Sequence, residues 1–425
     1  MAYPLQCIHR SLRQILCLLP ALLLFTPACS SPQREVVRSI VEGVEVVSNP
    51  ENPLTLHGKP RRLDFEHIRD YPGNEEDPDF RFALGSVAIG PDGSIFINDA
   101  PQYRILKYDA DWNFLFSMGR RGAGPGEFLE VAWMGLTPEG VIHASDEQNR
   151  RTVLFDAETG DFLDMIVYPH PGFRRASMLG SERLFAIYHS WVREREEIVF
   201  RWGVFDRSFE PVNLLIDRLD AALGDVTGIS RPEWLGRMDA QVPEPSLIFN
   251  VTVHGELLAG PDFEYSFSLY NSMGKEVRRI EREGPPSLLT EADRREIIDM
   301  NIRRWERYNE PGIANAAVQY LEFPEHRPAY VGIYDFDRRG FILVTIPDEN
   351  RVYWLEIYGR DGTYMARQPF TQFSEIFQIA GDTLYVALED ELGNAMLSSY
   401  RIRYLAGEGE DAREVTWQEW FGSGR

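Results

Sequence analysis

Hydrophobic and polar residues alternate along much of this chain in short runs that are separated by turn sequences. In the first clear run, Ile95 and Ile97 face one side and Phe96 faces the other. Further runs cover residues 104–108 and 114–118. Alternation with period two predicts β-strands, and the Pro-Asp-Gly sequence just before the first run predicts a tight turn.

The same arrangement of strands and turns occurs again further along the chain. A Pro-Glu-Gly turn is followed by a second alternating run and by a strand that opens with arginine. Five pairs of residues are each 47 positions apart: Pro91 and Pro138, Gly93 and Gly140, Asp99 and Asp146, Arg104 and Arg151, Asp109 and Asp156. A repeat of about 40–50 residues built from short strands has the size of a β-propeller blade.

Weaker copies of this unit begin near residues 183, 256, 337 and 381, which makes six in all. We therefore predict an all-β fold: a closed six-bladed β-propeller of four-stranded antiparallel blades over residues 37–406, with 407–425 as a C-terminal tail. Residues 62–65 precede the first unit and are a candidate outer strand for the last blade. Such an exchange would close the ring and cover an open sheet edge.

One segment, residues 287–308, does not follow the strand pattern. Its apolar residues recur at helical spacing, and Thr290 with Asp293 resembles a capping pair. We predict a helix inserted between the fourth and fifth blades. A charged surface helix is the simpler interpretation, and a lid or docking element is the alternative.

The N-terminus has the features of an export signal. Basic residues precede an apolar run over residues 15–25, and Ala28-Cys29 follows it. We predict a signal peptide over 1–28, lipidation of Cys29 and a tether over 29–36, although Thr26 and Pro27 depart from the usual lipobox. The alternative is ordinary cleavage after Ala28, which leaves a free Cys29 thiol. Both other cysteines of the chain fall inside the signal segment.

Composition narrows the range of partners. The formal net charge of −22 argues against nucleic acid, whose phosphates need clustered Lys and Arg. The histidines are scattered, none at the spacing of a metal site, and no nucleophile elbow or phosphate loop is present. We expect a monomer that needs no metal or cofactor and has no catalytic residue.

The turn sequence, Asp99, Arg104 and the run Gly-Ala-Gly-Pro-Gly-Glu-Phe at residues 122–128 together resemble NHL-type repeats. The chain resembles more closely a bacterial family of secreted six-bladed β-propeller lipoproteins. The resemblance spans about residues 37–405 and is strongest over 79–168. It implies the fold and a location in the cell envelope, most simply the outer membrane. That family has no settled activity, so no catalytic residue can be transferred from it.

Arginine opens a strand at one blade position in three of the units, with aspartate five residues earlier in two of them. The simpler interpretation is an Arg–Asp pair that stabilises each blade. The alternative is that some of these arginines line the pore mouth and bind an anion. The residues concerned are Asp99, Arg104, Asp146, Arg151 and Arg351.

Ligands of propellers usually bind at loops around one end of the channel. In this register those loops carry aromatic, amide and imidazole side chains, which are typical of contact surfaces. The ligand-binding candidates are Tyr103, Asn149, His189, Trp191 and Asn350, and Phe263 adds aromatic surface. Ordinary packing of these loops is the alternative.

These observations favour a lipid-anchored envelope protein that binds a protein, peptide or glycan and catalyses nothing. The competing hypothesis is a metal-dependent hydrolase or lactonase whose metal is held at the channel axis by acidic and Asn side chains. It is less favoured, because no blade shows an isolated polar cluster within an apolar inner strand.

Overall fold

The computed structural model describes residues 35–71, 87–192, 197–221, 247–305, 318, 323, 325–345, 352–370, 375–389 and 395–422. The chain divides into Met1–Glu35 and Val36–Arg425. All that follows concerns the second unit. Cys29, Asn350 and Arg351, which the sequence singles out, lie outside the described residues, as does the side chain of Trp191.

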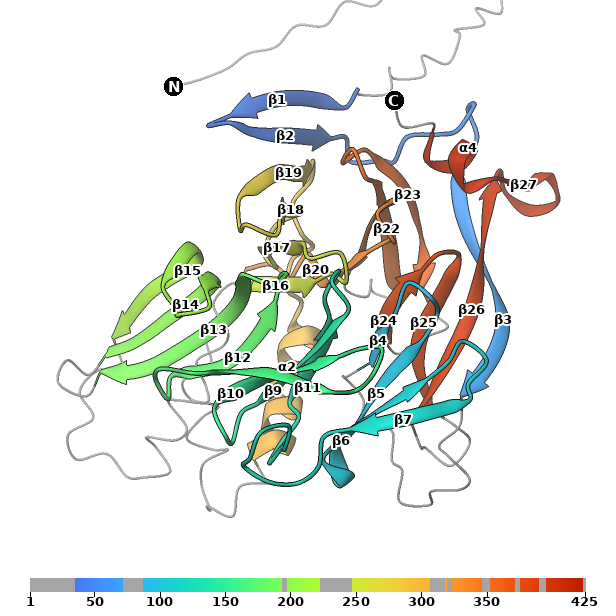
Figure 1. Ribbon diagram of the computed structural model, residues 1–425. Helices are drawn as coiled ribbons and strands as arrows, with labels where there is room; N and C mark the ends of the chain where they lie inside the picture. Colours follow the sequence, from blue (N-terminus) through green and yellow to red (C-terminus); the bar gives the residue numbers. More distant parts are fainter. Residues whose placement is uncertain are drawn as a thin grey trace, which may run out of the picture. The chain divides into compact units, whose positions relative to one another are not determined.

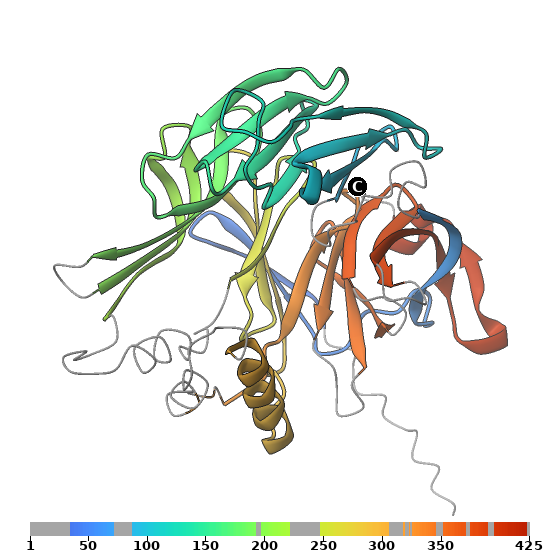
Figure 2. The same cartoon turned by 90° about the horizontal axis from the view of Figure 1, so that it is seen from below.

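The described strands form six sheets, which confirms the predicted number of blades (Figures 1 and 2). The first blade contains β4 (Val87–Ile89), β5 (Ile95–Asp99), β6 (Arg104–Tyr108) and β7 (Phe114–Met118), with the short helix η1 (Ala100–Gln102). The second contains β8 (Trp133–Leu136), β9 (Val141–Asp146), β10 (Arg151–Asp156) and β11 (Phe162–Val167). The third contains β12 (Phe173–Met178), β13 (Arg183–Val192), β14 (Glu197–Asp206) and β15 (Pro211–Ala221).

The other three blades follow in chain order. The fourth contains β16 (Leu247–Val251), β17 (Leu257–Pro261), β18 (Ser266–Tyr270) and β19 (Glu276–Arg282). The fifth contains β20 (Tyr330–Asp335), β21 (Gly340–Thr345), β22 (Tyr353–Gly359) and β23 (Tyr364–Phe370). The sixth contains β24 (Glu375–Ala380), β25 (Thr383–Glu389), β26 (Ala395–Ala406) and β3 (Arg61–Tyr71).

The first strand of each blade is the innermost, and these strands line the ring. β4 contacts β8, β8 contacts β12, β16 contacts β20, β20 contacts β24, and β24 contacts β4. The third and fourth blades meet through an apolar cluster that includes Phe185 and Val204 on one side and Leu257 and Ala259 on the other. Each sheet thereby buries its faces against its neighbours, which a lone hairpin cannot do.

The glycine-rich link between the first two blades illustrates how sequence determines this packing. Phe128 is fully buried, and its ring lies 5.7 Å from that of Phe155 in the second blade. A Cβ atom at Gly119, whose φ is 83°, would lie 2.3 Å from the Phe128 ring. Glycine is therefore needed at this position for both the turn and the close approach.

The predicted closure of the ring is confirmed. β3 pairs antiparallel with β26 over most of its length, so the start of the chain supplies the outer strand of the last blade. A second connection joins β24, the inner strand of the last blade, to β4, the inner strand of the first blade. The Gln378 amide accepts from the Ile89 N–H at 2.9 Å and donates to the Ile89 carbonyl at 2.9 Å.

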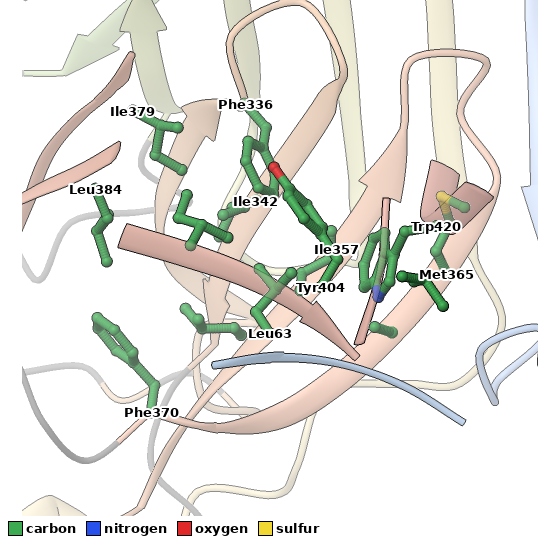
Figure 3. Packing of buried hydrophobic residues seen from close by; sticks show 14 of the residues in the cluster. Leu63, Phe336, Ile342, Ile357, Met365, Phe370, Ile379, Leu384, Tyr404 and Trp420 are labelled. Carbon is green, nitrogen blue, oxygen red and sulfur yellow. The ribbon is translucent and has the colours of Figure 1, made fainter. Parts of the chain in front are cut away.

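Two additions to the ring were not predicted. A hairpin of β1 (Val37–Val41) and β2 (Val44–Asn49) extends the fourth blade, because β2 pairs in parallel with β19. After the last blade, η2 (Gly409–Asp411), β27 (Arg413–Val415) and α4 (Trp417–Phe421) follow, and β27 pairs with β26. Figure 3 shows Trp420 of α4 near Tyr404 within the apolar cluster of the fifth and sixth blades.

The inserted helix lies between β19 and β20 as predicted, with a later start. It is α2 (Glu291–Trp305), and Thr290 precedes its first turn. The Asp293 carboxylate accepts from the Thr290 N–H at 2.7 Å, and the Thr290 hydroxyl accepts from the Asp293 N–H at 3.2 Å. This reciprocal capping fixes the start of the helix.

Candidate functional site

Two of the predicted ligand-binding residues lie against the link between the first and second blades. Tyr103 has a left-handed backbone with φ 56°, and the Arg121 guanidinium lies over its ring at 5.2 Å. The Asn149 amide donates to the Asp146 carboxylate at 2.6 Å and to the Gly122 carbonyl at 3.1 Å. Both side chains therefore hold this link, and both amide hydrogens of Asn149 are already used.

His189 lies in the third blade, within a cluster of aromatic rings. Its Nε2 accepts from the Trp202 indole N–H at 2.6 Å, and its ring meets Phe200 edge-on at 4.8 Å. Tyr103, Asn149 and His189 lie in the first, second and third blades. The predicted set thus comes from three blades, and its role in binding stays a prediction.

The repeated Arg and Asp residues contact one another in the first two blades, but with different geometry. Arg104 Nε lies 2.7 Å from the fully buried Asp99 carboxylate. Arg151 Nε lies 3.7 Å from Asp146. In the second blade the guanidinium donates instead to the carbonyls of Ala123, Gly124 and Glu127, while Asp146 accepts from the N–H groups of Leu129, Glu130 and Asn149. There the pair holds the incoming link as well as its own strands.

A groove of about 830 Å³ lies between the third and fourth blades. Its floor is the face of the fourth blade, where Ala259 is paired with Ser268 and Ser268 with Arg279. The side chains of Ala259 and Ser268 are small and leave space toward Leu215 and Ile216 of β15. These two residues also line the groove. A volume of this size is typical of pockets that take an organic ligand or a short segment of a polymer.

Aromatic rings and opposite charges line the same groove. Phe263 is 49% exposed, whereas Tyr265 and Tyr270 are half-buried. Burial raises the pKa of both tyrosines, so their phenols are protonated at neutral pH and can donate hydrogen bonds. Arg279 and Glu281 extend from the same face of β19, and Arg279 is held by two hydrogen bonds to Glu276.

The Tyr265 ring is positioned by a buried ion pair. The Arg282 guanidinium lies 3.4 Å from the centre of this ring, and its Nε donates to Glu356 of the fifth blade at 3.1 Å. Burial alone would lower the pKa of Arg282, but the Glu356 carboxylate and neighbouring tyrosines raise it above its ordinary value. The arginine therefore stays charged and fixes one wall of the groove to the next blade.

A second cavity, of about 240 Å³, lies along the channel between the inner strands. His143 borders it, and burial lowers the pKa of this histidine to about 3, so its ring is neutral. The ring fits only because residue 135 is glycine, where a Cβ would lie 2.6 Å from His143 Nε2. Asp335 is the one acidic side chain among the described residues that line this cavity.

Asp335 belongs to a group of charged side chains on the turns of the fourth and fifth blades. We call His254, Glu256, Asp335, Asp337 and Arg360 the turn cluster. His254 Nε2 lies 3.5 Å from Asp335 and 3.3 Å from Asp337, and Arg360 pairs with Glu256. Burial raises the pKa of Asp335 to about 6, whereas a hydrogen bond from His254 lowers that of Asp337.

The described residues contain no group of three His, Cys, Asp or Glu side chains that could hold a metal ion. Within the same ranges, no helix combines the length and the apolar character needed to cross a bilayer. The groove could not be predicted from the sequence, since its floor and walls come from strands that are far apart in the chain.

Comparison with known proteins gives matches at the level of structure. No protein-family model matches the chain, and no curated protein matches its sequence. A "putative exported protein" from Bacteroides fragilis is 13% identical with a TM-score of 0.49; the match covers 84% of this chain and 99% of that one. A DUF4221 family member from Bacteroides vulgatus is 11% identical with a TM-score of 0.47, over 80% and 98% of the two chains. The six-bladed β-propeller formed by the sheets of this chain is similar in fold to these Bacteroides proteins.

Proposed function

We propose that this protein is a lipid-anchored, non-catalytic binding protein of a bacterial cell envelope, and that it binds an oligosaccharide in the groove between the third and fourth blades. The observation that carries the proposal is the lining of that groove. It combines the exposed Phe263 ring, two protonated phenols and the charged side chains of Arg279 and Glu281.

This combination suits a sugar ring. One face of a pyranose carries C–H groups that pack on an aromatic ring, and its hydroxyls pair with carboxylate and guanidinium groups. A peptide would be bound most readily by a free strand edge. The groove floor is a sheet face, and the outer strand β19 is already paired with β2. The groove therefore favours a glycan over an extended peptide.

The same lining supports binding rather than turnover. Neither His nor Cys occurs among the described residues that line the groove. The Ser268 hydroxyl donates to the Glu276 carboxylate at 2.7 Å, and no histidine stands beside it among these lining residues to form a Ser–His pair. The location in the envelope rests on the predicted signal segment and on Cys29.

Titration of the purified protein with oligosaccharides selected on a glycan array tests the binding site. Phe263→Ala should weaken binding by about tenfold, equivalent to about 1.4 kcal/mol, because a stacking surface is lost. Leu163→Ala is the matched control, since Leu163 is 48% exposed on the outer strand of the second blade. Equal affinity of the two variants, or no retained glycan, would contradict the proposal.

The competing hydrolase hypothesis makes a different prediction. A metal-dependent lactonase would contain stoichiometric calcium or zinc after purification, and a chelator would abolish its turnover. We expect neither bound metal nor hydrolysis of lactones or esters. Metal analysis together with an esterase assay on the same sample distinguishes the two hypotheses.

A further inference from the structure

β1 is the outermost strand of the fourth blade, and its side chains are unusually apolar for so exposed a position. All five of its residues are exposed. Val37, Ile40 and Val41 are 61%, 71% and 48% exposed. Among the strands that the structure describes, β1 has only β2 beside it, so within this part of the chain its other edge carries unpaired N–H and C=O groups.

The hairpin that carries β1 is firmly attached to the ring. β2 pairs in parallel with β19 over five residue pairs. The Arg38 guanidinium donates to the Asp361 carboxylate at 2.6 Å and to the Thr363 hydroxyl at 2.9 Å in the fifth blade. The Asn49 amide donates to the Gly362 carbonyl at 2.9 Å. These contacts fix β1 at the outer rim of the ring.

Chain length limits how far this rim can be from the predicted anchor. Val37 lies eight positions after Cys29 in the chain. A fully extended chain of that length spans roughly 28 Å. If Cys29 carries acyl chains in a membrane, the first residue of β1 is held within that distance of the lipid surface, so even a weak apolar contact would be made at high effective concentration.

We infer that β1 is a membrane-contact strand that rests edge-on on the lipid surface, with Val37 and Val41 on one side of the strand and Ile40 on the other; this rests on the proposed acylation of Cys29. The free backbone groups of the edge cannot enter hydrocarbon without cost, so the strand lies at the level of the headgroups. Because the strands run from the channel outward to β1, the propeller would stand on the rim of its fourth blade, with its channel along the membrane.

Cys29 is the one cysteine of the sequence after the predicted signal segment. When Cys29 is acylated, a cysteine introduced elsewhere can therefore be labelled selectively. A nitroxide is attached to Ile40→Cys in the lipoprotein purified from membranes and reconstituted into phosphatidylcholine vesicles, whose neutral surface does not repel an acidic protein. Leu163→Cys is the control, because Leu163 has 48% exposure on β11, which is also an edge strand. Circular dichroism verifies that both variants fold.

We expect the label at residue 40 to lose accessibility to a water-soluble nickel chelate and to gain accessibility to oxygen when the protein is reconstituted. The label at residue 163 should stay accessible to the chelate. If both labels stay accessible while the protein remains with the vesicles, β1 does not contact lipid and the anchor is unaffected. If mass spectrometry finds Cys29 unmodified and the protein leaves the vesicles, the anchor and this inference both fail.

Discussion

Two aspartates of the turn cluster lie beside His254, yet their pKa values shift in opposite directions. Asp335 is buried, and burial raises its pKa from 3.8 to about 6. Asp337 is more exposed, and its hydrogen bond with His254 lowers its pKa. Asp335 therefore weakens the folded state at neutral pH, whereas Asp337 strengthens it.

Between pH 3.8 and about 6, the folded protein keeps a proton on Asp335 that the unfolded chain has released. The stability contributed by this proton is present below that range and is lost as the pH rises through it. We therefore expect Asp335→Asn to gain stability relative to the natural protein as the pH rises from 4 to 6. Urea unfolding at several pH values measures this.

Asp337→Asn is the control for this experiment, since its contribution is lost as the pH falls through its lowered pKa. Its stability difference from the natural protein should shrink in acid below about pH 4. A difference between Asp335→Asn and the natural protein that does not change with pH would contradict the assignment.

The Asp99–Arg104 pair gives a second prediction at this scale. Arg104→Ala leaves the fully buried Asp99 carboxylate without its guanidinium and should lower the free energy of unfolding by roughly 2–4 kcal/mol. Arg207→Ala is the comparison, because its pair with Asp164 is exposed on both sides and should contribute less than about 1 kcal/mol. Unchanged unfolding of Arg104→Ala with loss of ligand binding would instead favour an anion-binding role.

The proximity of residues within one repeat unit can be predicted from the sequence, whereas the proximity of the residues that line the groove cannot. Asp99 and Arg104 are close in the chain and recur at a fixed spacing, so their proximity is predictable. His254 and Asp335 meet only because consecutive blades bring their turns together. Leu215 and Ser268 border one groove for the same reason, and neither belongs to a motif.

Among the elements, α4 is the clearest case of a contribution that local pattern does not predict. Trp420 is fully buried, and its indole N–H donates to the Leu405 carbonyl at 3.1 Å. The Arg61 guanidinium donates to the Trp420 carbonyl at 2.8 Å. This helix of five residues therefore packs on β26 and connects it with the start of β3.

Removing the indole should destabilise the sixth blade substantially. Trp420→Ala should lower the free energy of unfolding by about 3–5 kcal/mol, since it leaves a cavity in the core. Trp417→Ala in the same helix should cost about 1 kcal/mol, because this side chain is 37% exposed and mainly loses its contact with Arg339. Similar losses for both variants in urea unfolding would show that α4 packs differently.

The strands were predictable to the extent that they follow the repeat. β6 and β7 have the predicted bounds, because alternation and turn residues mark both ends. Nothing in the local sequence of β1 and β2 indicates which strand they join, since β2 pairs with β19, more than two hundred residues later in the chain. Contacts of that range depend on the closed ring and not on local sequence.

At the scale of the whole molecule, carboxamide side chains connect backbone segments of different sheets. The Gln368 amide accepts from the Leu63 N–H at 2.7 Å and donates to its carbonyl at 3.0 Å. Gln378 holds Ile89 in the same way. Asn98 and Asn213 donate to the carbonyls of Val131 and Gly274. Each amide satisfies backbone groups that strand pairing leaves open at a junction.

Gln378 joins the last blade to the first, so its loss should affect the closure of the ring. In Gln378→Leu the buried N–H and C=O of Ile89 lose their partner, and each such group costs about 1–3 kcal/mol. We expect urea unfolding at lower denaturant and faster hydrogen exchange in both β4 and β24. Gln102→Leu, at an exposed position in η1, should leave both measurements unchanged. Faster exchange confined to β24 would mean that β3 alone holds the ring closed.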